Sequence, residues 1–130
     1  MINVIAGIIY HNDKILVARR ASHKQLGGFW EFPGGKLEAS ETHEACVIRE
    51  LKEEMNIDIS VNKYLMFNEH EYSGFSIRLH AYLCTFISGK LNLIDHDQVD
   101  WVDVSELSRI NFAPADIPIV LKLIETQSND

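Results

Sequence analysis

The sequence has little of what marks several specialised classes of protein. Only two of its 130 residues are cysteines, Cys46 and Cys84, and they form no C-x-x-C pair. Both lie in apolar stretches, so we expect buried free thiols in a reducing compartment. No apolar run reaches the roughly 18 residues that a membrane span needs, and the N-terminus lacks the basic segment of a signal peptide. We therefore expect a cytoplasmic protein that makes no contact with a membrane.

Positive charge is also scarce. The chain has 12 Lys and Arg against 19 Asp and Glu, a net charge of −7 at pH 7. Because nucleic-acid binders usually present a basic face, this balance argues against polymeric nucleic acid as a partner and leaves open a small anion bridged by metal ions. The six histidines show no H-x-H or H-E-x-x-H spacing, so none is assigned to a metal. Nothing indicates an obligate protein partner.

What is present indicates one domain over residues 1–130. Hydrophobic residues make up 46% of the chain, enough for a core at this length. Alternating apolar runs and helical patterns predict an α/β layered domain with a mixed sheet, and a long antiparallel pair argues against a doubly wound parallel fold. The expected strands are 2–10, 14–20, 31–32, 59–72, 75–87 and 99–104, and the expected helices are 42–55, a brief one within 105–112, and 114–126.

The helix expected over 42–55 belongs to an acidic stretch, since six of residues 34–57 are glutamates. On a helical wheel an apolar arc, with one misfit, is formed by Glu44, Val47, Ile48, Leu51 and Met55. Glu50, Glu53 and Glu54 fall roughly opposite. A solvated acidic face is one interpretation, but like charges at these spacings destabilise a helix by ~0.2–0.5 kcal/mol a pair. The alternative is a divalent cation, and hard carboxylate oxygens select Mg²⁺ or Mn²⁺.

The residues around this helix follow a longer spacing. From Gly35 to Ile57 they match G-x5-E-x7-R-E-U-x-E-E-x-G-U, where U is a bulky aliphatic residue. The single departure is Asn56 in place of the last glycine. That position favours a left-handed helix cap, for which Asn is the next best residue. The pattern resembles the Nudix box of the Nudix hydrolases.

The resemblance implies a fold, an activity and a cofactor. Nudix hydrolases have an α/β/α sandwich around a mixed sheet, and they hydrolyse a nucleoside diphosphate linked to another group with Mg²⁺ or Mn²⁺. By match, the implied metal ligands are the side chains of Glu50, Glu53 and Glu54 and the backbone carbonyl of Gly34, in what we read as a Gly-Gly turn. A retained set of glutamates favours catalysis over a purely nucleotide-binding role.

Two further residues of the box would support the chemistry. Arg49 and Glu41 are implied to pair, so that Arg49 orients the carboxylates that bind metal. Either Glu53 or Glu54 would take the proton of the attacking water, and the sequence leaves this choice open. The implied partner is a small nucleotide.

The resemblance extends to the MutT-type subgroup, which cleans nucleotide pools by releasing a nucleoside monophosphate and pyrophosphate. It is carried by "ARRASHKQLGGFWEFPGGKLE" and by the C-terminal "FAPADIPIVLKL". By match, Arg20 would reach the nucleotide and Phe32 would line the base pocket, although a solvated strand end and a plain core residue are the respective alternatives. Asp95 would supply a further ligand, with Asp97 as its competitor.

The residue expected to read the base is Asp116. An ionised Asp only accepts hydrogen bonds, whereas the guanine-oxidation member of the subgroup has an Asn, which both donates and accepts. Two substrates therefore stay open, oxidised guanine nucleotides and cytidine or modified cytidine nucleotides, with nucleoside-diphosphate sugars and dinucleoside polyphosphates as remoter ones. The plainer interpretation of Asp116 is a first-turn carboxylate on the last helix.

Overall fold

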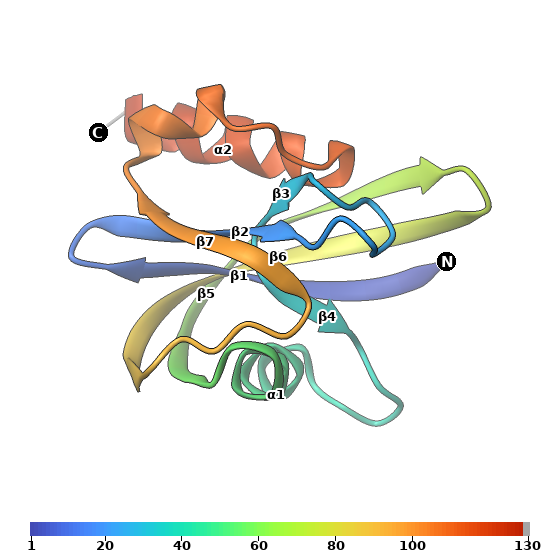
Figure 1. The fold of residues 1–130 in the computed structure, drawn as a ribbon, viewed down its shortest axis with the longest axis horizontal. Helices are drawn as coiled ribbons and strands as arrows, with labels where there is room; N and C mark the ends of the chain where they lie inside the picture. The colour runs from blue at the N-terminus through green and yellow to red at the C-terminus, as the bar shows by residue number, and fades with distance from the viewer. Residues whose placement is uncertain (129–130) are drawn as a thin grey trace.

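A computed structural model describes residues 1–128 of the chain. The elements are β1 (Ile2–His11), β2 (Lys14–Arg20), β3 (Trp30–Glu31), β4 (Gly34–Lys36), α1 (His43–Met55), β5 (Ile57–Tyr72), β6 (Phe75–Gly89), β7 (His96–Val102), the 3₁₀ helices η1 (Val104–Arg109) and η2 (Pro114–Asp116), and α2 (Ile117–Ser128). Figure 1 shows the strands as a central layer with α1 on one face and α2 on the other. The predicted α/β/α sandwich is confirmed.

The sheet is mixed because one of its strand pairs is parallel. The strand order is β3-β2-β1-β6-β5, with β4 beside β1 and β7 beside β2. The parallel pair is β1 with β6, in register from Ile2↔Ile77 to Tyr10↔Thr85. Both predicted hairpins, β1–β2 and β5–β6, are present and antiparallel. The second hairpin begins and ends two residues further out than expected at its open end.

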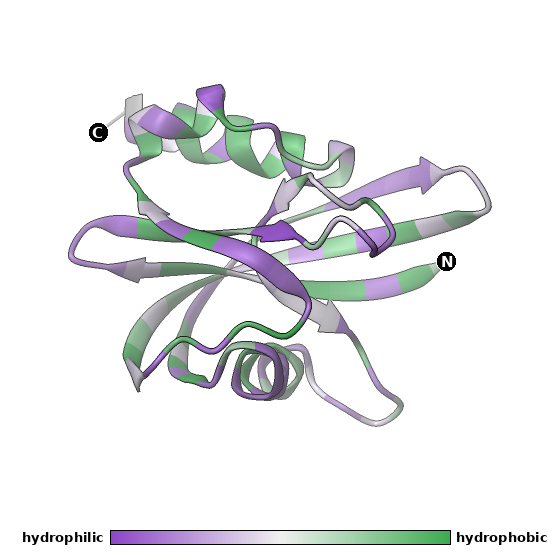
Figure 2. Cartoon of the chain, viewed as in Figure 1, coloured by the Kyte–Doolittle hydropathy of each residue, from purple (hydrophilic) through white to green (hydrophobic). Residues whose placement is uncertain are grey.

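Alternation along the central strand divides the core into two layers. On β1, Ala6 and Ile8 pack toward α2, whereas Ile5 and Ile9 pack toward α1. Figure 2 shows the matching pattern, with apolar residues alternating along the strands and forming stripes on both helices. Burial of each large aliphatic side chain stabilises the fold by about 1.5–3 kcal/mol. Both helices are therefore fixed against the sheet. The side chains on the other sides of α1 are held in place with the helix.

Helix α1 has well-defined ends but a different buried face from the one expected. The Thr42 side chain accepts a hydrogen bond from Ala45 N–H at 3.1 Å, and Asn56 closes the helix in the left-handed conformation (φ 58°, ψ 39°). The buried side chains are those of Cys46, Val47, Leu51 and Met55. The expected place of Ile48 in the apolar arc was wrong, because Ile48 is 41% exposed while the smaller Cys46 packs on the sheet.

The Gly34-Gly35 pair is a strand, not the turn that we expected. It forms β4 and pairs antiparallel with β1, Gly34 opposite Ala6 and Gly35 opposite Ile5. A Cβ at position 34 would overlap the Ile5 carbonyl, so only glycine allows this close approach of two backbones.

Two other predicted boundaries were also wrong. The last helix begins with η2 and continues as α2 from Ile117, with Pro118 in its first turn, where proline is tolerated. Strand β7 begins at His96 rather than at residue 99, so Asp95 directly precedes it. Among residues 1–128 no helix is long and apolar enough to cross a membrane.

Candidate active site

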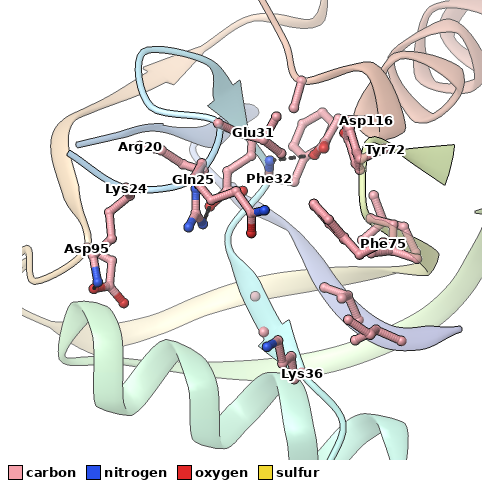
Figure 3. Close-up of a pocket in the computed structure, with 18 of the residues that line it drawn as sticks. Arg20, Lys24, Gln25, Glu31, Phe32, Lys36, Tyr72, Phe75, Asp95 and Asp116 are labelled. Carbon is pink, nitrogen blue, oxygen red and sulfur yellow. Dashed lines mark hydrogen bonds and ion pairs between the residues drawn. The ribbon is translucent and has the colours of Figure 1, made fainter. Parts of the chain in front are cut away.

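A cleft of about 620 Å³ opens between β4, α1 and the tip of the β5–β6 hairpin, with the β2–β3 loop and η2 completing its walls. Figure 3 shows its labelled side chains, with Asp95 and Lys24 at the end away from Tyr72, Phe75 and Asp116. Of the residues predicted to act, those that line the cleft are Arg20, Phe32, Gly34, Glu50, Glu54, Asp95 and Asp116. Glu41, Arg49 and Glu53 stand behind or beside the lining. One cavity thus brings together segments that lie almost 100 residues apart.

Glu50 and Glu54 form an acidic cluster on the α1 wall. The Glu50 carboxylate lies so close to β4 that a Cβ at Gly35 would overlap it. The pKa of Glu54 is raised to about 8, first because burial removes water from the carboxyl, and then by its hydrogen bond to Glu50 and by the negative charges of Glu50, Asp95 and Glu31. The cluster therefore retains a proton that a cation would displace.

Arg49 connects the glutamates of the box. Its Nε donates to Glu41 Oε2 at 2.6 Å and its Nη2 to Glu41 Oε1 at 3.0 Å. The same guanidinium donates from Nη1 to Glu50 at 2.9 Å and to Glu53 at 3.2 Å. The hydrogen bond from Arg49 is the main reason that the pKa of Glu41 falls to about 2. The expected pair of Arg49 and Glu41 is thus present, and it holds the arginine where it can orient Glu50 and Glu53.

The donor set of the cluster fits a hard divalent cation. Among residues 1–128, no three acidic, His or Cys side chains are already arranged as a metal site. In the cleft Glu50 is bonded to Arg49 and Asp95 to Lys24. The available oxygens are carboxylates, which Mg²⁺ and Mn²⁺ prefer, and the pKa of Glu54 is raised first by burial and then by Glu50 and the other nearby carboxylates, whose negative charge a cation would offset. Glu50 and Glu54 are therefore the residues of the cleft lining that would hold such a cation.

The two aspartates before and within β7 have different surroundings. Asp95 lines the cleft, and its Oδ1 lies 2.9 Å from Lys24 Nζ, a hydrogen bond that lowers its pKa. Asp97 lies outside the cleft lining and accepts from Arg19 Nε at 2.8 Å. The geometry favours Asp95 over Asp97 as the additional acidic group of the site.

The other end of the cleft is aromatic. Phe32 is only 3% exposed and stacks on Phe112 with ring centroids 4.9 Å apart, so it belongs to the core and to the wall at once. Across from it, Tyr72 and Phe75 stack at 5.1 Å on the two sides of the hairpin turn. Such faces suit a flat nucleobase, because every base offers a π-face for stacking.

Arg20 lies between the two ends of the cleft. Its Nε donates to the Gln25 carbonyl at 2.8 Å, and its Nη1 lies 3.3 Å from Glu31 Oε2. These contacts hold Arg20 against the cleft wall rather than as a solvated strand end.

Asp116 lies at the bottom of the aromatic end and is 5% exposed. Its Oδ2 accepts from Phe32 N–H at 3.0 Å, a bond to β3–β4 and not to its own helix. The pKa of Asp116 is raised well above the ordinary value, mainly because burial disfavours the charged form and then because of the charge on Glu31. Simple capping of the last helix therefore does not describe this residue.

Several lining residues were not predicted. Glu31 Oε2 lies 2.7 Å from Nε2 of the buried His96, whose Nδ1 has no hydrogen-bond partner among the described residues. Lys24, Tyr72 and Phe75 also line the cleft. Tyr72 and Phe75 flank the turn of a predicted hairpin, but Tyr72 packs partly against the core, so its position in the sequence does not mark it as a cleft residue. Lys24 and the pair of Glu31 with His96 had no sequence signal either.

The fold and this cleft are those of a Nudix domain, and comparison with known proteins agrees. A model of the NUDIX domain matches residues 4–122. The chain is 38% identical over 120 residues to the CTP pyrophosphohydrolase of Escherichia coli strain K12, across 92% of this chain and 89% of that protein. It is 32% identical over 125 residues to the 8-oxo-dGTP diphosphatase of the same strain, across 94% and 95%.

A solved structure gives the same result in three dimensions. The solution structure of the E. coli ORF135 protein superposes with a TM-score of 0.87 at 35% identity, covering 99% of this chain and 92% of that one. The chain belongs to the Nudix family, as its sequence pattern predicted. The two E. coli relatives that match it over nearly its whole length are named as a CTP pyrophosphohydrolase and an 8-oxo-dGTP diphosphatase.

Proposed function

We propose that the protein is a divalent-cation-dependent pyrophosphohydrolase of nucleoside triphosphates, with Mg²⁺ as its natural ion and Mn²⁺ as a substitute. One observation carries the proposal: a single cleft joins the carboxylates of Glu50 and Glu54 to an aromatic pocket that ends at a buried Asp116. That layout matches a triphosphate at one end and a base at the other. A net charge of −7 speaks against a polymeric nucleic acid in the same cleft.

The residues supply positioning and proton transfer. When bound, the cation neutralises the phosphates and activates water. Glu50 and Glu54 hold it, Arg49 orients Glu50 and Glu53, and Lys24 and Arg20 are the cations on the facing loop that can meet phosphate oxygens. Glu54 or Glu53 accepts the proton of the attacking water.

The products of this reaction would be a nucleoside monophosphate and pyrophosphate, from attack at the β-phosphorus, as in the subgroup that the sequence resembles. Hydrolysis in ¹⁸O-water tests this directly. The label should appear in pyrophosphate. Label in the monophosphate would mean attack at the α-phosphorus, and release of orthophosphate with a nucleoside diphosphate would contradict the proposed reaction.

For the base, we propose an oxidised guanine nucleotide as the principal substrate. The sequence predicts Asp116 as an ionised side chain that only accepts hydrogen bonds, but its buried position alters that assumption. Since its pKa is raised, the carboxyl keeps its proton to a higher pH than an ordinary Asp, and a protonated carboxyl both donates and accepts, as Asn does. It can therefore serve a base edge that carries a donor beside an acceptor.

Cytidine or modified cytidine triphosphate is the second candidate. It is favoured by the ionised form of Asp116, which only accepts and so matches the cytosine amino group, and by the 38% identity to a CTP pyrophosphohydrolase. The two candidates make different demands on the same side chain.

A screen of normal and damaged nucleoside triphosphates, ranked by kcat/KM, tests the proposal. It should be run in parallel for the wild type, Asp116→Ala and Asp116→Asn. We expect Asp116→Ala to lower kcat/KM about tenfold or more for the preferred nucleotide and much less for poor ones, because a buried polar group of the base that loses its hydrogen-bond partner costs about 1–3 kcal/mol. An equal loss for every base would show that Asp116 is structural.

A further inference from the structure

We infer that Asn68 and Tyr72, on the outer half of β5, are positioning residues that fix the carboxyl of Asp116 for base recognition; this rests on the proposed function. They act through Ala115, the residue before Asp116, which they hold from both sides. Neither residue belongs to the Nudix box, and the proposal requires no contact of either with the reacting phosphates.

Both polar groups of the Ala115 backbone are bound by side chains of β5. Asn68 Nδ2 donates to the Ala115 carbonyl at 3.0 Å, and the Ala115 N–H donates to the Tyr72 hydroxyl at 3.0 Å. Ala115 is 1% exposed, so water cannot replace these partners. It also lies at the start of η2, where backbone N–H groups have no acceptor within the helix. The two side chains therefore satisfy a buried backbone that would otherwise be left unpaired.

Other bonds of this turn lie within it or lead to β3 and the residue after it. Asp116 N–H donates to the Ala113 carbonyl at 2.9 Å, and Ala113 N–H donates to the Trp30 carbonyl at 2.9 Å. The Asp116 carboxyl itself accepts from Phe32 N–H. One side of η2 is thus fixed to β3 and the other to the β5–β6 hairpin. Because hydrogen bonds weaken steeply with angle, a small shift of η2 toward either side would change which base edge the carboxyl fits.

Tyr72 also joins the two walls of the base end. Its ring stacks on Phe75 at 5.1 Å and lines the cleft, while its hydroxyl is bound to Ala115 on the other wall. Figure 3 shows Tyr72 between Phe75 and Asp116. The hydroxyl therefore sets the spacing between the aromatic wall and the base-reading carboxyl.

The test is to remove the hydroxyl and keep the ring. With Tyr72→Phe we expect kcat/KM for the preferred nucleotide to fall about threefold to tenfold, the range that one buried hydrogen bond commands. The fall should come from a higher KM, and kcat/KM for poor substrates should change little. The ratio of kcat/KM between the preferred and the poor nucleotides should therefore become smaller. Asn68→Asp, which removes the donor at constant shape, should act in the same direction. In ¹H–¹⁵N spectra of Tyr72→Phe the Ala115 amide should shift and exchange faster.

A matched control is available on the other face of the hairpin. The Tyr64 hydroxyl lies 3.3 Å from His80 Nδ1, and Tyr64 is 41% exposed and outside the cleft lining. Tyr64→Phe should leave preference and kcat/KM unchanged. If Tyr72→Phe instead lowers Tm and slows all substrates alike, its role is merely structural and the inference is wrong.

A double-mutant cycle separates this inference from the proposed function. In an Asp116→Ala background, Tyr72→Phe should cause no further loss of preference, because both act through one carboxyl. Asp116→Leu replaces Asp116→Ala if the latter fails to fold, since an apolar residue of similar volume tolerates burial. If Tyr72→Phe still changes base preference in the Asp116→Ala background, Tyr72 contacts the base directly and its positioning role is wrong.

Two further outcomes distinguish failure of the positioning role from failure of base recognition by Asp116. If Asp116→Ala changes preference but Tyr72→Phe and Asn68→Asp do not, only the positioning role is wrong. If Asp116→Ala itself leaves preference as in the wild type, base reading by Asp116 fails and the inference fails with it, while hydrolysis by the acidic cluster stands untouched.

Discussion

Glu53 and Glu54 are adjacent in the sequence but meet different surroundings. Glu54 lines the cleft, and its pKa is raised to about 8, chiefly by burial. The Glu53 side chain is 60% exposed and is bonded to Arg49. The first has the environment of a group that binds a cation or takes a proton within the cleft, whereas the second lies outside the cleft lining, next to Arg49.

Removal of either charge should stop turnover. We expect Glu54→Gln and Glu53→Gln to lower kcat by about 10²–10⁴-fold, because charge neutralisation and proton transfer are lost. Chelation of divalent cations should abolish activity of the wild type. Steady-state kinetics at saturating Mg²⁺ measure the effect, and Glu44→Gln, exposed on the same helix, is the control. Near-normal turnover in both box variants would sink the metal assignment.

The base preference should depend on pH through Asp116. Its raised pKa keeps the carboxyl protonated to a higher pH than usual, and that form donates as well as accepts. As pH rises through the folded pKa, the donor is lost, so preference should move from oxidised guanine toward cytidine nucleotides. Ratios of kcat/KM measured over a series of pH values give the measurement. Asp116→Asn, which cannot ionise, should show a flat ratio; a parallel slope in that variant would assign the effect elsewhere.

Helices and strands with a long hydrophobic period can be predicted from the sequence. Conformations that depend on contact with another element cannot. The hairpins and α1 were visible because their patterns are long. Strand β4 was not, because two glycines have no side chain to show a strand pattern, and their conformation is set by pairing with β1. The exposed position of Ile48 was missed for a similar reason, since a helical wheel ranks residues by type and not by the surface they meet.

Asn56 carries the one departure from the box pattern, and its conformation makes a clear prediction. It ends α1 at φ 58°, and its Nδ2 donates to the Lys90 carbonyl at 3.2 Å. Asn56→Gly should change the free energy of unfolding by less than about 0.5 kcal/mol, whereas Asn56→Ala should cost about 1–2 kcal/mol for a left-handed Cβ. Urea denaturation measures both. If Asn56→Ala is as stable as the wild type, the left-handed cap does not explain the role of Asn56.

Over the whole molecule, the two halves of the site differ in how far sequence reveals them. The acidic half comes from one segment of the chain, so the fixed spacing of its residues is visible in the sequence. The base half is assembled from β2, β3, the β5–β6 hairpin and η2, which only the β1–β6 pairing brings together. Arg20, Phe32 and Asp116 were reached by resemblance alone, and Tyr72 was not reached, because no local rule links distant segments.

The acidic cluster should also set how stability depends on pH. The folded pKa of Glu54 is about 8 against an ordinary 4.5, so the folded state binds more protons between these values. With chelator present, the free energy of unfolding should therefore fall as pH rises through that window, and Asp116 contributes in the same sense. Thermal unfolding across this range checks it. Glu54→Gln should give a flatter curve, and Mg²⁺ should restore stability at the alkaline end; identical curves for both proteins would contradict the prediction.

The placement of the two cysteines bears on the conditions in which the protein can work. Cys46 is fully buried on the sheet-facing side of α1 and Cys84 is 1% exposed in β6, both as free thiols. Burial raises the pKa of each to about 12. Peroxide attacks the thiolate, and an inaccessible neutral thiol resists it. Peroxide should therefore inactivate this protein only slowly through either cysteine.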